Sequence, residues 1–279
     1  MNPQITIVIG TLNRPKVVLS LINQLEKESK RIPLEVIVFN QGIKFNFPKK
    51  NNFSLIHLDK PNTCKYLNLG WKKAKAPIIL YLDDDVTITE NTITSHIEAY
   101  KDSSIMAVAG RVINDGELTS ADPQVGKILW FGAEFTKNFS YEKQVFVDFP
   151  YGCNMSFRKI TLEKVGGFDE RLAPPIYSFN EVDIGYRINK IWPNSIVFKP
   201  EALVYHHRYK SGGTRNNFDP SDIFHANQFN YGYFLGKNFS LVENASCFFR
   251  KLPYQIIKEP KAISHILQGF IYGKKQEKK

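Results

Sequence analysis

Short apolar runs alternate with amphipathic stretches in the first part of the chain, and this alternation most limits the possible folds. Four runs of mainly aliphatic and β-branched residues occupy residues 5–9, 34–39, 54–58 and 78–82. Helical patterns separate them at two places, because Pro15 can open a helix with an apolar face and residues 64–74 form a second helical stretch. Strand and helix signals at this spacing indicate βαβ units. The predicted fold class is therefore α/β, with a mostly parallel central sheet flanked by helices.

Three of these predicted strands end in polar clusters. Residues 11–14 follow the first strand, residues 40–42 the second and residues 83–85 the last. Parallel sheets bind ligands beyond the carboxyl ends of their strands, at the point where the strand order reverses. We therefore expect the three clusters to converge on one edge of the sheet.

Three consecutive aspartates, Asp83, Asp84 and Asp85, come directly after a strongly apolar strand. Side chains alternate along an extended backbone, so Asp83 and Asp85 are predicted to point one way and Asp84 the other. Crowded carboxylates repel one another, and a hard divalent cation such as Mg²⁺ or Mn²⁺ relieves that repulsion. The alternative is a cluster that caps a helix beginning within residues 87–90.

Composition and charge narrow the class of protein and its partners. The 279 residues are 43% hydrophobic and 23% charged, which excludes collagen-like, disordered and disulfide-scaffold proteins. A net charge of +10 indicates an acidic partner, such as nucleic acid, a phosphorylated ligand or an anionic membrane. Because the sequence contains no recognisable nucleic-acid-binding motif, nucleic acid is not an expected partner.

Cysteine usage and the lengths of the apolar runs indicate a cytoplasmic protein. Cys64, Cys153 and Cys247 are odd in number and lack metal-binding spacing, so reduced structural thiols are expected. The run at residues 5–9 is too short for the core of a signal peptide, and residues 76–82 are too short to span a bilayer. The chain is therefore predicted to be neither exported nor membrane-spanning.

The second half of the chain shows less regular patterns. Residues 151–157 and 195–205 are strand-like, residues 182–191 form a predicted helix, and residues 206–220 form a polar loop. Near the end, five apolar residues share one helical stripe and four lysines follow it: Ile263, Ile266, Leu267, Phe270, Ile271, Lys274, Lys275, Lys278 and Lys279. The first interpretation is a packed terminal helix with a solvated tail. Peripheral attachment to anionic lipid is the alternative.

Six short motifs follow one another along the chain. They are IVIGTLNR (residues 7–14), EVIV (35–38), LYLDDD (80–85), GCNMSFR (152–158), GGFDE (166–170) and EVDIGYR (181–187). In their order and spacing they resemble family 2 of the glycosyltransferases, whose members have the GT-A fold. The resemblance extends over about residues 5–215, and the set of motifs carries it rather than any single one.

The resemblance implies that the first half binds a nucleotide-diphosphate sugar, the donor substrate. Contacts to the donor would come from the strand ends and from two later segments: Thr11, Asn13, Arg14, Asn40, Asp83, Asp84, Asn154 and Arg215. The resemblance also implies an Mn²⁺ or Mg²⁺ ion held by Asp83, Asp85 and His206. Glu181 would act as the general base of an inverting transfer, with Asp183 as the second choice.

Several of these assignments keep an alternative. Most relatives carry aspartate where this chain has Asn40, and this departure leaves the identity of the nucleotide open. Acidic residues in a first helical turn also stabilise the helix dipole, which is the structural alternative for Glu181 and Asp183. His206 is either a metal ligand or a structural histidine, and the basic loop after it either contacts phosphate or is solvated.

The resemblance predicts a GT-A catalytic domain at residues 1–220 and a helical extension with a basic tail at residues 221–279. Residues 1–115 would bind the nucleotide sugar and residues 116–220 the acceptor. The predicted activity is metal-dependent, inverting transfer of a sugar to a hydroxyl of a glycan or lipid-linked glycan. It would serve surface-polysaccharide synthesis in the cytoplasm, with the tail contacting the inner face of the membrane. The alternatives are a nucleotidyltransferase, although the chain has no Gly-rich phosphate loop, and a non-catalytic binding protein of the same fold.

Overall fold

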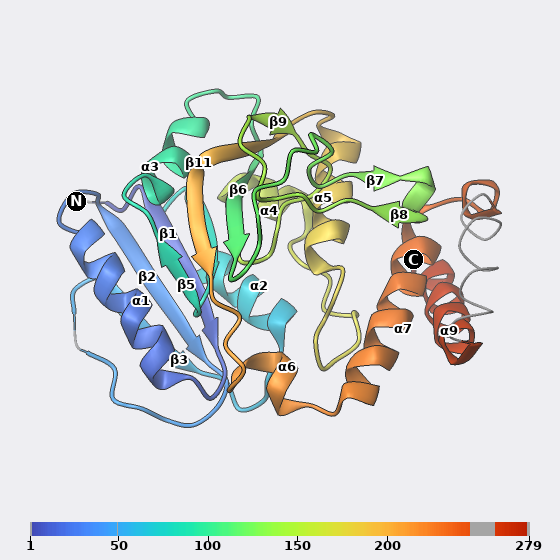
Figure 1. The fold of residues 1–279 in the computed structure, drawn as a ribbon, viewed down its shortest axis with the longest axis horizontal. Coiled ribbons are helices and arrows are strands. Elements are labelled where there is room, and N and C mark those ends of the chain that lie inside the picture. Colours follow the sequence, from blue (N-terminus) through green and yellow to red (C-terminus); the bar gives the residue numbers. More distant parts are fainter. Residues whose placement is uncertain (1, 49, 246–259, 278–279) are drawn as a thin grey trace.

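The computed structural model describes residues 2–48, 50–245 and 260–277. Its centre is a large mixed sheet with the strand order β3-β2-β1-β4-β10-β6-β11-β5, and β9 pairs with β11 (Figure 1). The strands of this sheet are β1 (Ile5–Thr11), β2 (Leu34–Asn40), β3 (Phe53–His57), β4 (Ile78–Asp83), β5 (Val86–Ile88), β6 (Ala107–Asn114), β9 (Val145–Phe146), β10 (Asn154–Arg158) and β11 (Ile196–His206). A small hairpin of β7 (Ile128–Leu129) and β8 (Glu134–Phe135) encloses the 3-10 turn η1 (Trp130–Gly132).

Helices pack around this sheet and extend it at one end. They are α1 (Pro15–Glu28), α2 (Thr63–Lys73), α3 (Thr92–Ala99), α4 (Lys159–Val165), α5 (Asn180–Ile191), α6 (Gly213–Asn217), α7 (Pro220–Asn238) and α9 (Pro260–Glu277). In Figure 1, α7 and α9 lie side by side, in orange and red, away from the N-terminal strands. None of the described helices is both long and apolar enough to cross a bilayer.

The first half of the sheet is parallel, as the alternation of strand and helix signals predicts. β1 pairs in parallel with β2 on one side and with β4 on the other, and β3 continues the parallel set beyond β2. Every residue of β2 is buried, which is typical of a parallel strand covered on both faces. The predicted apolar face of α1 (Val18, Leu21, Ile22 and Leu25) is buried in the same core.

The second half adds antiparallel strands, and these bring distant segments to the end of β4. β10 lies between β4 and β6 and is antiparallel to both, with Asn154 opposite Leu82. β11 runs parallel to β6 and ends at His206. The predicted strand at residues 151–157 therefore begins at Asn154, and residues 151–153 form a turn next to the last residues of β4.

The backbone after the aspartates decides between a metal-binding and a helix-capping interpretation of these residues. The segment that follows Asp85 is the strand β5, which pairs with β11, and α3 begins only at Thr92. The interpretation of the aspartates as a helix-capping cluster is therefore wrong. Within the predicted polar loop at residues 206–220, the structure contains the short helix α6.

Glycines bring α7 and α9 into backbone contact. A Cβ atom added at Gly232 would lie 1.9 Å from the Ile266 carbonyl oxygen, and one added at Gly269 would lie 2.0 Å from the Phe229 carbonyl oxygen. The glycines make the closest contact between the two helices, so only part of the apolar stripe of α9 is buried. Ile266 is buried, whereas Leu267 and Ile271 are 42% and 55% exposed. The predicted terminal helix is thus present, but its apolar stripe is not fully packed. Lys278 and Lys279 lie outside the described residues.

Candidate active site

Asp84 is a buried carboxylate at the carboxyl edge of the sheet, and two neighbouring side chains donate hydrogen bonds to it. Its Oδ2 atom accepts a hydrogen bond of 2.6 Å from the Thr11 hydroxyl and one of 3.2 Å from Arg14 Nε. Burial raises the pKa of the Asp84 carboxyl to about 7, and the Arg14 charge and the Thr11 hydrogen bond act against that increase. Thr11, Arg14 and Asp84 therefore contact one another at this edge, and their direct contacts with a donor substrate stay predictions.

Arg14 also orients Asp85. Its guanidinium donates a hydrogen bond of 2.8 Å to Asp85 Oδ2, which leaves the other carboxylate oxygen for a different partner. Burial acts to raise the pKa of the Asp85 carboxyl, but contacts with His206 and Arg14 outweigh it and lower the pKa to about 2. Asp85 is therefore ionised at neutral pH despite being only 4% exposed.

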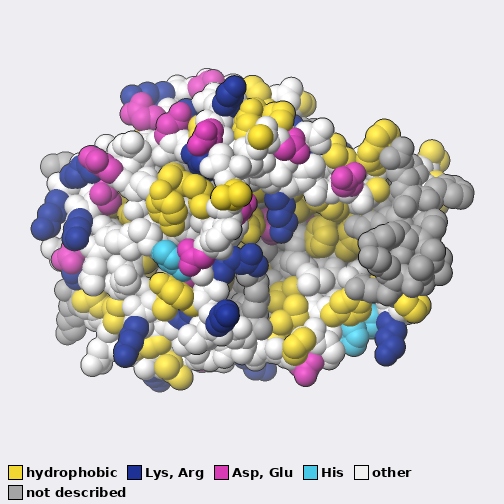
Figure 2. Space-filling model, in the orientation of Figure 1, with side chains coloured by type: hydrophobic (Ala, Val, Ile, Leu, Met, Phe, Trp, Pro, Cys, Tyr) yellow, Lys and Arg dark blue, Asp and Glu magenta, His cyan; other side chains and the backbone are white. Residues whose placement is uncertain are grey.

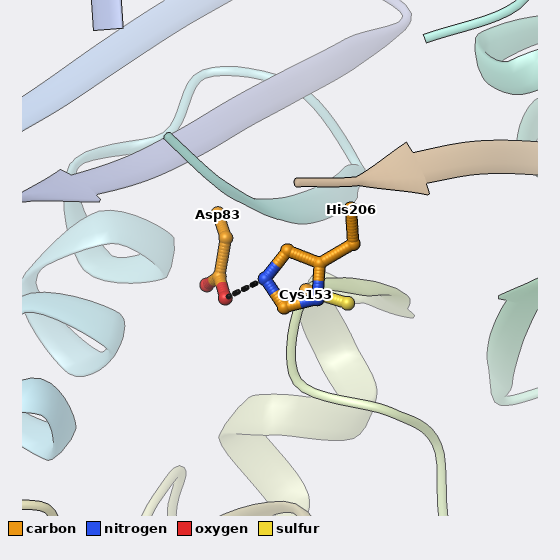
Figure 3. Close-up of side chains that lie close together, drawn as sticks. All are labelled: Asp83, Cys153 and His206. Atoms are coloured by element: carbon orange, nitrogen blue, oxygen red, sulfur yellow. Dashed lines mark ion pairs between the residues drawn. The ribbon is translucent and has the colours of Figure 1, made fainter. Parts of the chain in front are cut away.

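The second oxygen of Asp85 faces His206. Asp85 Oδ1 is buried and makes no hydrogen bond within the part of the chain that the structure describes, although it lies 3.3 Å from His206 Nε2. Asp83 Oδ2 lies 3.7 Å from the same nitrogen, and Figure 3 shows the two side chains facing each other. Asp83 and Asp85 therefore both lie near His206, as predicted, but Asp84 and Asp85 lie in a turn after β4 and share the Arg14 guanidinium.

The opposite nitrogen of His206 is held by Asn114. His206 Nδ1 lies 2.9 Å from Asn114 Oδ1, and the Asn114 amide nitrogen donates to the Glu117 carboxylate. This orientation of the amide makes Asn114 Oδ1 an acceptor, so we assign the proton of a neutral His206 to Nδ1. Nε2 then faces two carboxylates, an arrangement that a cation between them would stabilise.

The residues present fit a divalent cation. Asp83, Cys153 and His206 each offer one ligand atom, and these three atoms lie within 4.8 Å of one another. The Asp83 side chain is 41% exposed, whereas the Cys153 and His206 residues are almost fully buried, so the protein encloses one side of the cluster and leaves the other accessible. Asp83 and His206 belong to the predicted ligand set, whereas Asp85 is outside this three-atom cluster and its oxygen Oδ1 lies 3.3 Å from His206 Nε2. Carboxylate oxygens and imidazole nitrogen suit Mn²⁺, and carboxylate oxygens suit Mg²⁺.

Glu181 lies in the first turn of α5, which begins after Phe179 in a left-handed conformation (φ +68°). Burial raises the pKa of the Glu181 carboxyl, the nearby Lys137 lowers it, and the Asp83 carboxylate raises it further. Among the described residues, no other side chain is hydrogen-bonded to this carboxylate. Glu181 is therefore a half-buried acid with a raised pKa, and a hydrogen bond from its own backbone N–H acts against that increase.

Tyr151 connects the two acidic parts of the site. Burial raises the pKa of its phenol, and the carboxylates of Glu181 and Asp83 add to this effect, so both charges lie near the same ring. Lys137 Nζ lies 5.6 Å from the centre of that ring. The charges of Asp83 and Glu181, which are far apart in the sequence, thus both act on the Tyr151 phenol.

Asp183 occupies a different environment from Glu181. Its carboxylate accepts hydrogen bonds from Arg187 Nε (2.8 Å), Lys237 Nζ (2.7 Å) and Asn238 Nδ2 (3.1 Å). Burial acts to raise the pKa of Asp183, but the charges of Arg187 and Lys237 outweigh it, so the pKa is lowered. A buried carboxylate with a lowered pKa and these three donors is a poor proton acceptor. These contacts favour Glu181 over Asp183 as the base, and both assignments stay predictions.

Asn13 and Asn40, which are both predicted to contact the donor substrate, form hydrogen bonds within and between the loops at the sheet edge. The Asn40 side chain accepts from Gly42 N and donates to the Ile43 carbonyl, so it folds its own loop. Asn13 Oδ1 accepts from Ile43 N, and Asn13 Nδ2 donates to Asn217 Oδ1. The polar clusters after β1, β2 and β4 therefore converge, as predicted. Asn13 is exposed at this junction and Asn40 is buried within it.

Asn154 lies under the site rather than in it. Its amide nitrogen donates to the Ala202 and Arg111 carbonyls at 2.7 and 3.0 Å, and its Oδ1 lies 2.9 Å from His96 Nε2. The side chain is fully buried. The prediction that Asn154 contacts the donor is therefore replaced by a structural role that connects β10 to β6 and β11.

The loop after β11 closes over Arg14. Gly212 and Gly213 have φ values of +64° and +66°, and a Cβ added at Gly212 would lie 2.2 Å from Arg14 Cγ. Only glycine combines this conformation with so close an approach. Arg208 in the same loop is exposed, and Figure 2 shows basic side chains gathered near the middle of this face, beside acidic and histidine side chains. The predicted phosphate contact Arg215 lies in α6, but its side chain lies outside the described part of the structure.

Sequence comparison identifies the family of this chain. A sequence model described as glycosyl transferase family 2 matches residues 6–166, which is more than half of the chain. The chain belongs to glycosyl transferase family 2. The match also confirms the expected enzyme class, a glycosyltransferase, and disfavours the nucleotidyltransferase alternative. None of the curated proteins searched matches the chain.

Solved structures show that this family 2 chain has the predicted GT-A fold. S. aureus TarS residues 1–349, solved with UDP-GlcNAc, superimposes with a TM-score of 0.61 at 14% identity, over 96% of this chain and 81% of that one. The mannosyltransferase PcManGT from Pyrobaculum calidifontis, solved with GDP-Man and Mn²⁺, gives 0.54 at 14% identity, over 98% and 87%. GalNAc-T7, solved with UDP, GalNAc and Mn²⁺, gives 0.60 at 12% identity, and the match covers 92% of this chain but only 57% of that protein.

Proposed function

We propose that the protein transfers a sugar from a nucleotide-diphosphate donor to an acceptor hydroxyl with inversion at the anomeric carbon, and that the reaction depends on a divalent cation. One observation carries the proposal: Asp85 Oδ1, which has no hydrogen-bond partner among the described residues, faces His206 Nε2 beside Asp83, and the Asp83 charge acts on Glu181, whose pKa is raised. Similar folds have been solved with UDP, UDP-GlcNAc or GDP-Man, and two of them with Mn²⁺, which supports this class of ligand.

Asp83, Asp85 and His206 would hold the cation. When bound, it would supply Lewis-acid stabilisation of the charge on the diphosphate leaving group. Arg14 positions the Asp85 carboxylate, and Asn114 fixes the His206 ring, so both groups are oriented before any ligand binds. This preorganisation is what electrostatic stabilisation of a leaving group requires.

Glu181 would act as the general base. Its carboxylate takes the proton of the acceptor hydroxyl while the hydroxyl oxygen bonds to the anomeric carbon and the bond from that carbon to the phosphate oxygen breaks. A raised pKa makes the carboxylate a stronger base, provided that it is ionised at the working pH. We therefore expect the rate to fall as the pH drops through the raised pKa of Glu181, above the usual range of a glutamate.

The acceptor is proposed to be a glycan or a lipid-linked glycan in surface-polysaccharide synthesis, at the inner face of the cytoplasmic membrane. Support comes from α9, which exposes Leu267 and Ile271 and also Lys275 in its last turn. Exposed apolar and basic side chains on one helix suit contact with an anionic lipid surface.

The test combines ligand binding and turnover. Thermal unfolding with UDP, GDP, dTDP and CMP, each with and without Mn²⁺, identifies the nucleotide, because a ligand that binds only the folded protein raises the midpoint. Glu181→Gln is then expected to reduce turnover by about 100-fold or more and to leave the Mn²⁺-dependent shift unchanged. Turnover of Glu181→Gln within a few-fold of wild type would contradict the base assignment. Glu163→Gln, on the exposed side of α4, is the matched control and is expected to behave as wild type.

A further inference from the structure

Cys153 lies at the candidate cation site, although the spacing of the cysteines indicates no metal site. The antiparallel register that puts Asn154 opposite Leu82 continues by one residue, so Cys153 lies next to Asp83. The two backbones are joined there, because Asp83 N donates to the Cys153 carbonyl at 3.4 Å. The sheet itself therefore fixes the position of the thiol beside the carboxylate.

The thiol shares this position with two other potential ligands. One ligand atom from each of Asp83, Cys153 and His206 lies within 4.8 Å of the others, and Figure 3 shows the cysteine alongside the imidazole ring. Cys153 is only 3% exposed and His206 only 4%. The sulfur thus lies on the enclosed side of the cluster, and Asp83 lies on the accessible side.

A second and independent observation indicates that this cluster is built for a cation. Asp85 Oδ1 is buried without a hydrogen bond from the described residues, and it lies 3.3 Å from His206 Nε2. An unpartnered buried carboxylate oxygen is costly unless something positive compensates it. Oxygen from Asp83, nitrogen from His206 and sulfur from Cys153 therefore lie within 4.8 Å of one another, and Asp85 Oδ1 lies beside the same imidazole.

We propose that Cys153 is a ligand of the cation in this site and that the enzyme consequently favours thiophilic cations over Mg²⁺. Sulfur is a soft ligand that suits Zn²⁺, Co²⁺ and Cd²⁺, whereas Mg²⁺ prefers oxygen ligands alone. Ligation replaces the S–H bond by a sulfur–metal bond, and the released proton passes to the buffer. The inference rests on the proposed cation site, and it adds a ligand to it and a metal preference.

The decisive test uses a variant that retains Cys153 as its sole thiol. The chain has three cysteines, so the double variant Cys64→Ser/Cys247→Ser leaves Cys153 alone. Titration of this full-length variant with CdCl₂ or CoCl₂ is followed by the ultraviolet thiolate-to-metal charge-transfer absorption and, in parallel, by calorimetry. We expect a charge-transfer band that saturates at one equivalent of metal. Metal binding without this band overturns the proposal, since no other thiol is present.

The matched variant is Cys153→Ser in the wild-type background, with Cys153→Ala as the second choice if the serine protein is unstable. Its ratio of Cd²⁺ affinity to Mg²⁺ affinity is expected to fall at least tenfold relative to wild type, whereas Cys64→Ser, in buried α2, should keep the wild-type ratio. An unchanged ratio in the Cys153 variants means that the thiol only fills space, and it overturns the proposal. Failure of wild type to bind any of these cations, with or without UDP, would instead overturn the proposed cation site itself.

Discussion

Replacement of Lys237 by methionine removes the cation that joins two buried carboxylates at the junction of α5 and α7. Lys237 Nζ lies 2.7 Å from Asp169 Oδ2 and 2.7 Å from Asp183 Oδ1, and the three side chains are 13%, 5% and 2% exposed. Each carboxylate keeps one guanidinium, from Arg171 or Arg187. Methionine has a similar length, so the substitution removes the charge and leaves little cavity.

The expected loss of stability follows from this burial. Removal of one partner from a buried ion pair costs 3–5 kcal/mol, because a charge is left uncompensated. Since each aspartate here retains an arginine, we expect the lower end for Lys237→Met, about 3 kcal/mol at pH 7. The measurement is urea unfolding followed by tryptophan fluorescence, with the midpoint and slope determined separately.

The stability that Lys237 contributes is expected to depend on pH. Burial acts to raise the pKa of Asp169 and Asp183, but their cationic partners outweigh it, so both pKa values are lower in the folded protein. The stability that they contribute is therefore present above the unfolded pKa, about 3.9, and is lost as the pH falls below it. The difference between wild type and Lys237→Met should therefore shrink as the pH falls from about 4 toward the lowered pKa values of the folded protein.

The control is Lys101→Met, which breaks an exposed pair with Glu98 whose side chains are 73% and 58% exposed. Exposed pairs contribute little, so this variant should lose less than about 0.5 kcal/mol. A loss below about 1 kcal/mol for Lys237→Met, or a loss that does not vary with pH, would refute the interpretation of Lys237 as a buried counter-ion.

Two further predictions concern residues beneath the site. Burial lowers the pKa of His96 to about 4. The unfolded chain therefore binds the extra proton, and the free energy of unfolding should fall by about 2 kcal/mol between pH 7 and pH 5. The free energy of unfolding of His96→Gln, measured by urea titration, should lack that part of the pH dependence. An unchanged pH dependence would contradict this prediction. Gly212→Ala should cost about 2 kcal/mol or more, because its Cβ would lie 2.2 Å from Arg14 Cγ at a positive φ. Gly116→Ala is the control: it shares the positive φ but has no atom within 4 Å, so equal losses in thermal unfolding would contradict the argument.

Local patterns in the sequence were sufficient to predict the parallel half of the fold and the position of the aspartates. Helical periodicity and runs of apolar residues are properties of neighbouring residues in the sequence. Local sequence therefore suffices to predict β1, α1, β2 and β4. The convergence of the clusters after these strands follows from parallel pairing alone, and the Thr11–Asp84 hydrogen bond reflects it. The division of the chain at residue 220 and the metal ligation by Asp83, Asp85 and His206 stay predictions.

The roles of Glu181 and Asp183 could not be separated by sequence reasoning. Both lie in the first turn of α5, but residues two apart in a helix point to different sides. Only the packing of α7 against α5 decides which side holds Lys237, and that cation makes Asp183 structural. Glu181 makes none of these contacts, and the charge of Asp83 raises its pKa.

The ligands that come from distant segments were decided by the tertiary structure. His206 is brought to Asp85 because β11 runs beside β6, and Cys153 is brought to Asp83 because β10 lies antiparallel between β4 and β6. Strand insertion of this kind depends on the register of long-range hydrogen bonds, which no local pattern encodes. The sequence by itself therefore determined the parallel strands and the acidic edge of this protein, and only the tertiary structure decided which thiol, imidazole and lysine lie against that edge.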